Sequence, residues 1–147
     1  MPSLSLLLSP DTIVDSGSAD REAVLEALAQ AGARASAVDA AKLLEAIQER
    51  EKLMSTGFGD GMAMPHVRLA GVKRFTTVLG RSRPGVEFGA IDGKPVRLFL
   101  LVVGPEADRD GYKKLLARAA NFLKAEGQGL MAAPDLSAAV TAIAQDY

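Results

Sequence analysis

His66 is the only histidine in this 147-residue chain, and its neighbours in sequence suit phosphate chemistry. An imidazole is neutral enough to attack and basic enough to carry a charge near neutral pH. Pro65 fixes the backbone just before it, and three glycines upstream allow backbone N–H groups to point at an anion. Cationic side chains that would offset phosphate charge are Arg50, Arg68, Lys73 and Arg74. From spacing alone, the pattern fits either a phosphate-accepting histidine or an ordinary histidine near a turn.

Other kinds of site fit the sequence less well. A Ser-His-Asp hydrolase would need Ser55, His66 and Asp60 or Asp92, but no G-x-S-x-G sequence is present. The glycines of residues 57–61 do not form G-x-G-x-x-G, and residues 89–94 lack the spacing and hydroxyl of a Walker motif. Bound nucleotide is therefore not indicated. The acidic residues are scattered as they are on solvated turns and helix starts: Glu87, Asp92, Glu106, Asp108 and Asp110.

Composition narrows the class of protein further. Seventeen basic and eighteen acidic side chains give a net charge of -1, which disfavours a nucleic-acid partner. Without cysteine and with one histidine, the chain has no thiolate or two-histidine metal site, and no cofactor is expected. The apolar residues 4–8 are too few for a signal peptide or membrane span, so we expect a cytoplasmic protein.

The elements that must position His66 follow from periodicity. Apolar spacing predicts a helix over residues 19–31, capped by Ser18 or Asp20 and ended by Gly32, and a second after Ser36 that continues to residue 50 or 53. Residues 4–8 read as a short strand or arm, and residues 56–66 as a loop entering a strand. Further strands are expected over 75–82 and 96–103, with turns at 84–85 and 92–93 between them. Two more helices follow, one from Tyr112 and one from residue 134. This order predicts a single α/β layered domain spanning residues 1–147.

Two segments resemble a known family. Residues 50–66, REKLMSTGFGDGMAMPH, resemble the active-site signature of the mannitol/fructose-type IIA domains of the bacterial phosphotransferase system (PTS EIIA type 2). Residues 88–96, FGAIDGKPV, resemble the turn and strand that follow, especially in the nitrogen-regulatory (PtsN-like) branch. The resemblance implies a three-layer sandwich with a mixed central sheet flanked by helices.

The resemblance also implies a function. His66 would accept phosphate from the phosphohistidine of a small HPr/NPr-like carrier protein, in a reversible transfer that needs no metal. Arg50 matches a family arginine near the phosphohistidine, and the backbone of Thr56, Gly57, Gly59 and Gly61 would form a phosphate-binding loop. The expected role is regulatory. Alternatives are a sugar-specific IIA that passes phosphate to a IIB domain, and a protein-docking module that no longer turns over phosphate.

Two positions depart from the family pattern. Tyr112 stands where members commonly carry a second histidine that supports the first, and a phenol cannot become cationic. The alternative is that Tyr112 only belongs to its helix's apolar stripe. Val67 stands where a small residue usually follows the active histidine, and we expect its β-branched side chain to narrow access for a partner. Both departures favour a regulator over a fast transporter component.

Overall fold

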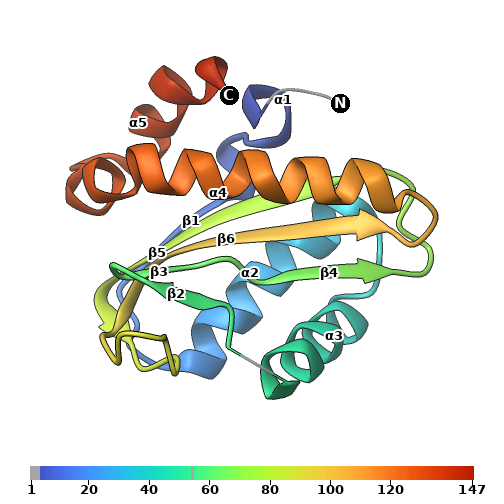
Figure 1. Ribbon diagram of the computed structural model, residues 1–147, viewed down its shortest axis with the longest axis horizontal. Coiled ribbons are helices and arrows are strands. Elements are labelled where there is room, and N and C mark those ends of the chain that lie inside the picture. Colours follow the sequence, from blue (N-terminus) through green and yellow to red (C-terminus); the bar gives the residue numbers. More distant parts are fainter. Residues whose placement is uncertain (1–3, 54) are drawn as a thin grey trace.

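The computed structural model describes residues 4–53 and 55–147, in which a mixed sheet lies between two layers of helices (Figure 1). The helices are α1 (Leu4–Leu7), α2 (Arg21–Ser36), α3 (Ala40–Leu53), α4 (Arg109–Ala132) and α5 (Leu136–Ile143), with 3-10 turns η1 (Pro10–Thr12) and η2 (Ala144–Asp146). The strands are β1 (Ile13–Ser16), β2 (Gly57–Gly59), β3 (Met62–Ala63), β4 (His66–Leu69), β5 (Thr76–Val86) and β6 (Val96–Pro105). The predicted three-layer fold with a mixed central sheet is confirmed.

The long strand β6 organises the sheet, whose order is β1-β5-β6-β3-β2. β5 runs antiparallel to β6, while β1 pairs parallel with β5. On its other side β6 pairs in parallel first with β3 and then with β4. The short β2 forms an antiparallel hairpin with β3. The strand that begins at His66 therefore lies at an edge of the sheet, beyond the end of β2.

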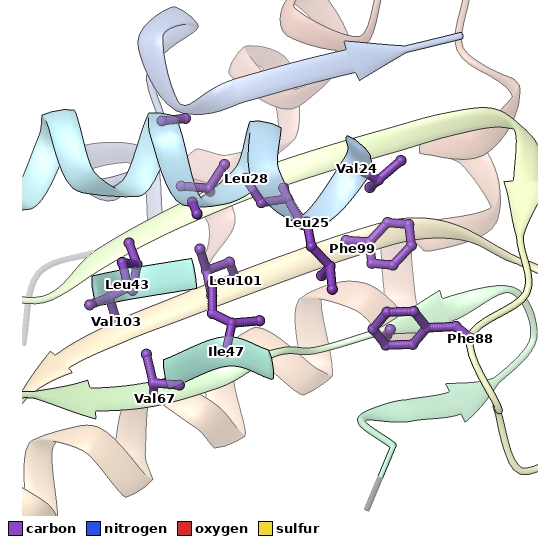
Figure 2. Packing of buried hydrophobic residues seen from close by; sticks show 14 of the residues in the cluster. Val24, Leu25, Leu28, Leu43, Ile47, Val67, Phe88, Phe99, Leu101 and Val103 are labelled. Carbon is purple, nitrogen blue, oxygen red and sulfur yellow. The ribbon is translucent and has the colours of Figure 1, made fainter. Parts of the chain in front are cut away.

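Alternate residues of β6 form two separate cores, as expected for a strand covered on both faces. One set packs in the cluster under α2 and α3, which Figure 2 shows, and the other packs under α4 and α5. The first set comprises Phe99, Leu101 and Val103, and the second comprises Leu98, Leu100 and Val102. All six side chains are fully buried, so the predicted strand over 96–103 is confirmed as the centre of the fold.

Helix α2 begins where the sequence predicts, because the Asp20 carboxylate accepts a hydrogen bond from the Ala23 N–H. The prediction that Gly32 ends it is wrong, since the helix continues to Ser36. A Cβ at Gly32 would lie 3.1 Å from Leu43 and 3.3 Å from Leu101, so this glycine permits close packing instead of termination.

The first residues of the chain were expected to be extended, and that prediction is wrong. Leu4–Leu7 form a helical turn, and Leu4 is fully buried in the α4–α5 cluster. The Leu4 N–H donates to the Tyr147 carbonyl over 3.0 Å, so the two ends of the fold meet. Tertiary burial outweighs an alternation pattern of only five residues.

Two further boundaries differ from prediction. Asp39, not Ser36, caps α3 by accepting the Lys42 N–H, while the Ser36 hydroxyl donates to the Gly32 carbonyl inside α2. The turn expected at residues 84–85 lies within β5, where the register with β6 shifts between Arg81 and Val86.

The C-terminal end of α4 is held by a buried cation. Arg81, with 2% of its side chain exposed, donates to the carbonyls of Leu130 and Ala133 and forms two bonds to the Asp15 carboxylate. These bonds join β5, β1 and the end of α4. Of the described helices, none is both long and apolar enough to cross a lipid bilayer.

Candidate functional site

His66 is the first residue of β4, just after a break in the edge of the sheet. Residues 64 and 65 separate β3 from β4, although both strands pair with β6. The Pro65 carbonyl still accepts the Val102 N–H over 2.9 Å, and His66 is paired in register with Val102. Because the proline ring restricts the backbone, the break holds the imidazole at a fixed point of the edge.

One nitrogen of the His66 ring is already engaged. Its Nδ1 lies 2.8 Å from the Met64 carbonyl oxygen, which can only accept a hydrogen bond. Nδ1 therefore carries the proton, and Nε2 keeps its lone pair. The ring is half-buried, and the bond at Nδ1 restrains its orientation. This is the tautomer that a nucleophilic histidine needs.

Successive side chains of β4 point to opposite faces of the sheet. His66 and Arg68 share the face covered by α4, while Val67 is buried in the cluster under α3. The expectation that Val67 narrows access to His66 is therefore wrong, because its side chain points away from the imidazole into the core. The same alternation brings the Arg68 guanidinium to the site.

Tyr112, in the first turns of α4, faces His66 across the edge of the sheet. The two ring centroids are 6.2 Å apart, with 49° between the ring planes. Gly104 gives the phenol room, since a Cβ there would lie 2.8 Å from Tyr112 and 3.1 Å from Phe75. Burial raises the pKa of Tyr112 to about 12, although the charges of Arg68 and Arg50 act in the opposite direction. The phenol is thus uncharged at neutral pH.

The predicted arginine also belongs to this region. Arg50 lies in the last turn of α3, and its positive charge reaches Tyr112, whose pKa it lowers against the effect of burial. The structure thus brings the predicted residues His66, Arg50 and Tyr112 to one region of the molecule.

Thr56 is close to the site, but its donors are taken. The Thr56 N–H lies 3.0 Å from the Glu51 carboxylate, which also accepts a short bond from the Thr56 hydroxyl. Its carbonyl accepts the Met64 N–H, which ties this residue to the backbone before His66. The Gly57 N–H is bound by the Ser55 hydroxyl. Thr56 and Gly57 therefore support the site without free N–H groups for phosphate, contrary to expectation.

Gly59 and Gly61 lie at the tip of the β2–β3 hairpin, where both have positive φ angles. The Gly61 carbonyl bonds the N–H groups of Arg97 and Leu98 on β6, four to five residues from the partner of His66. At strand spacing that separation is about 13 Å or more. The predicted phosphate-binding loop is therefore wrong for these two glycines, which serve a tight turn.

The hairpin tip already holds an anion of the protein itself. The Asp92 carboxylate accepts the N–H groups of Lys94 and Asp60, and these bonds hold the pKa of Asp92 below its usual value. The Asp60 N–H, between the two glycines of the turn, is thus already bound by a side chain.

Two residues near the site were not singled out as site residues from the sequence. Glu51 is 94% buried and holds Thr56, but within a run of alternating charges nothing distinguished it. Arg68 had been noted only as a nearby cation. The sequence could have indicated a role for Arg68, because residues two apart on a strand share a face and Arg68 follows His66 by two.

Beyond Tyr112 lies a shallow pocket of about 380 Å³ lined by Arg68, Arg109, Tyr112, Lys113 and Leu116. Its charged lining residues are all cationic. Among the described residues, no group of three histidine, aspartate or glutamate side chains is arranged to hold a metal ion.

Comparison with known proteins identifies the class to which this fold belongs, the IIA-type domains. Residues 6–145 match the family described as "Phosphoenolpyruvate-dependent sugar phosphotransferase system, EIIA 2". The chain belongs to this family.

Particular relatives refine the assignment. A nitrogen regulatory protein of Pseudomonas aeruginosa is 38% identical over 123 residues, covering 82% of this chain and 79% of the relative. The crystal structure of nitrogen regulatory protein IIA-Ntr from Neisseria meningitidis superposes with a TM-score of 0.86 at 31% identity, over 95% of this chain and 97% of that one. The mannitol IIA enzyme of Escherichia coli, solved in complex with phosphorylated mannitol IIB, shares the fold. It superposes with a TM-score of 0.77 at 18% identity, over 95% of this chain and 98% of that one.

Proposed function

We propose that this chain is a regulatory phosphocarrier of the phosphotransferase system, in which Nε2 of His66 accepts a phosphoryl group from the phosphohistidine of an HPr/NPr-like carrier protein. The observation that supports this most is the bond from His66 Nδ1 to the Met64 carbonyl, which leaves Nε2 as the nucleophile. The regulatory role is supported by the nitrogen regulatory relatives. We propose that the chain acts as one domain in the cytoplasm.

The transfer balances without a co-reactant. The Nε2 lone pair of neutral His66 forms a bond to phosphorus, while the N–P bond of a donor phosphohistidine, protonated on its other nitrogen, breaks. The electron pair of that bond returns to the donor ring, which leaves as neutral imidazole. The His66 Nδ1 proton stays in place, and the ring becomes positively charged. The Met64 carbonyl stabilises this charge, since hydrogen bonds to charged groups are stronger than neutral ones.

Charge stabilisation accounts for most of the catalysis of phosphoryl transfer. The cations of Arg50 and Arg68 supply it here, and Tyr112 covers one side of the imidazole as a neutral ring. In this proposal Thr56 and Glu51 hold the backbone before His66, and the hairpin glycines take no part in binding phosphate.

Intact-protein mass spectrometry after incubation with phosphoenolpyruvate, Enzyme I and a carrier protein tests the proposal. We expect one acid-labile phosphoryl adduct, absent from His66→Ala. Because His66 is the only histidine, loss of the adduct in His66→Ala assigns the phosphohistidine to this residue. Ser55→Ala is the control that should keep the adduct. An acid-stable adduct, or none with any carrier, contradicts the proposal.

A sugar-specific role is the second candidate, supported by the mannitol IIA that shares the fold and is complexed with IIB. Phosphorylated protein mixed with IIB domains separates the two. Transfer to a fructose- or mannitol-type IIB within seconds would favour sugar uptake, and retention of the phosphoryl group would favour regulation.

A further inference from the structure

Arg68 lies beside His66 with most of its hydrogen-bonding capacity unused. Its Nη1 donates to the Glu106 carbonyl over 3.1 Å, and its guanidinium carbon lies 5.7 Å from the centroid of the Tyr112 ring. A guanidinium has five N–H donors, so several remain after this bond. In the described part of the chain, no carboxylate forms an ion pair with Arg68.

The position of this cation is set by the fold. His66 and Arg68 are two residues apart on β4, about 6.6 Å along the strand and on the same face. Tyr112 contributes a ring face that attracts the guanidinium, and the Glu106 carbonyl fixes its far end. Arg68 is thus held on the same face of β4 as His66, half-buried, with Tyr112 as a common neighbour and with no carboxylate paired to it among the described residues.

A phosphoryl group on Nε2 would bring close to two negative charges into this region. Tyr112 is neutral and offers at most one hydrogen bond. A guanidinium is suited to phosphate, because its N–H groups match two oxygens at once.

We propose that Arg68 binds the phosphoryl group carried by His66, using N–H groups that the Glu106 carbonyl leaves free, while the Tyr112 ring orients the guanidinium. This inference rests on the proposed function for its biological meaning. Its chemistry can be tested without a partner protein.

Phosphoramidate, a small chemical phosphoryl donor, provides that test. Nε2 of His66 forms the new bond to phosphorus, the N–P bond of phosphoramidate breaks, and its nitrogen leaves as ammonia. The initial rate of adduct formation and the lifetime of the phosphohistidine are followed by ³¹P NMR on the full chain.

The matched control is Arg97→Gln. Like Arg68, Arg97 is a strand arginine that donates to a backbone carbonyl, that of Arg83, but it is exposed and lies five residues along β6 from the partner of His66. We expect Arg68→Gln to slow phosphorylation about tenfold, Arg68→Lys to recover part of the rate, and Arg97→Gln to match wild type. All variants should unfold at the wild-type temperature, because Arg68 packs at the surface.

Tyr112→His in the Arg68→Gln background adds a second readout. An imidazolium at this position supplies a cation that the phenol lacks, so it should restore part of the lost rate. A purely structural role for Arg68 would not be rescued in this way.

Equal rates for Arg68→Gln, Arg97→Gln and wild type would overturn this inference while leaving the phosphocarrier proposal intact. Conversely, if phosphoramidate labels His66 but no carrier protein does, the proposed function fails and the Arg68 comparison still stands. If His66 takes phosphate from neither donor, both are wrong.

Discussion

At the scale of single residues, the bond from His66 Nδ1 to Met64 leaves only Nε2 with a free lone pair for the proposed transfer. We predict that the phosphoryl group is attached to Nε2, because phosphorylation of Nδ1 would break this bond and turn the ring out of its site. Long-range ¹H–¹⁵N correlation spectra of the phosphorylated protein distinguish the two isomers. A phosphorus coupling to Nδ1 would contradict the geometry.

Tyr112 gives a second prediction, at alkaline pH. Its folded-state pKa of about 12 exceeds the ordinary value of 10.0 because partial burial of the ring disfavours the phenolate. Between these values the folded chain keeps a proton that the unfolded chain has lost, so stability should fall as pH rises through this window. Tyr112→Phe should remove the part of this loss that Tyr112 causes and leave the part due to Tyr147, whose pKa burial also raises, as measured by urea unfolding at several pH values.

The spectroscopic control is the ultraviolet titration of phenolate. The chain has two tyrosines, and Tyr112→Phe should abolish the component that titrates near pH 12. A Tyr112 that ionises near 10 would mean that the ring is solvated and does not pack on Gly104.

The residues of the site differ in how far the sequence predicts them. Arg50 and His66 are predicted together because both belong to the segment 50–66, which resembles the family signature, and Tyr112 is predicted because it stands where family members carry a second histidine. The hairpin glycines were assigned to phosphate binding because positive φ and anion binding favour the same residue type. Only the strand register shows that Gly59 and Gly61 lie far along β6 from His66. The role of Glu51 depends on a contact with Thr56, which no periodicity encodes.

At the scale of elements, the end of α4 depends on Arg81. We predict that Arg81→Met destabilises the protein by about 3–5 kcal/mol, because it removes the guanidinium donor from the carbonyls of Leu130 and Ala133 and takes away the closer partner of Asp15. Arg81 is also the main reason that the pKa of Asp15 lies below its usual value. Thermal and urea unfolding measure the loss.

Arg83→Met is the matched control for this change. Arg83 also bonds the Asp15 carboxylate, over 3.1 Å, but 59% of its side chain is exposed. An exposed ion pair contributes about 1 kcal/mol or less, so the control should unfold near the wild type. Equal losses for both variants would show that the carbonyls at the end of α4 do not depend on Arg81.

The elements themselves follow from sequence where burial and periodicity agree. The sequence predicts β6 because an unbroken apolar run of this length indicates a buried strand. It predicts α4 because a long stripe of apolar residues at helical spacing indicates a helix. The Gly32 and residue 84–85 predictions failed because glycine and proline signal a break only in the absence of tertiary packing. Helix α2 passes Gly32 because α3 and β6 press against it, and β5 absorbs Pro84 and Gly85 through a register shift.

At the scale of the whole molecule, the two faces of the sheet have separate roles. Figure 2 shows the hydrophobic core on the face under α2 and α3, whereas the face under α4 also carries His66 and Arg68 at its edge. The site is therefore supported by a sheet whose central strand is buried on both sides.

The closing contact of the fold gives a last prediction. Leu4→Ala should cost about 3 kcal/mol although it lies near the chain end, because its side chain is fully buried under α4 and α5. Leu53→Ala, at a position 83% exposed, should change stability by no more than about 0.5 kcal/mol. Urea unfolding of both variants makes the comparison, and similar values would mean that α1 does not dock.

The hydrogen bond between the Leu4 N–H and the Tyr147 carbonyl brings the first and last elements of the fold together. Figure 1 shows α4 between these two ends and β4, the strand that His66 begins. Leu4 and Tyr147 therefore lie side by side, and α4 separates them from β4. A domain of this shape can be inserted into a larger protein at a single surface loop, or permuted to begin elsewhere, with the sheet edge that carries His66 left uncovered by the new connections.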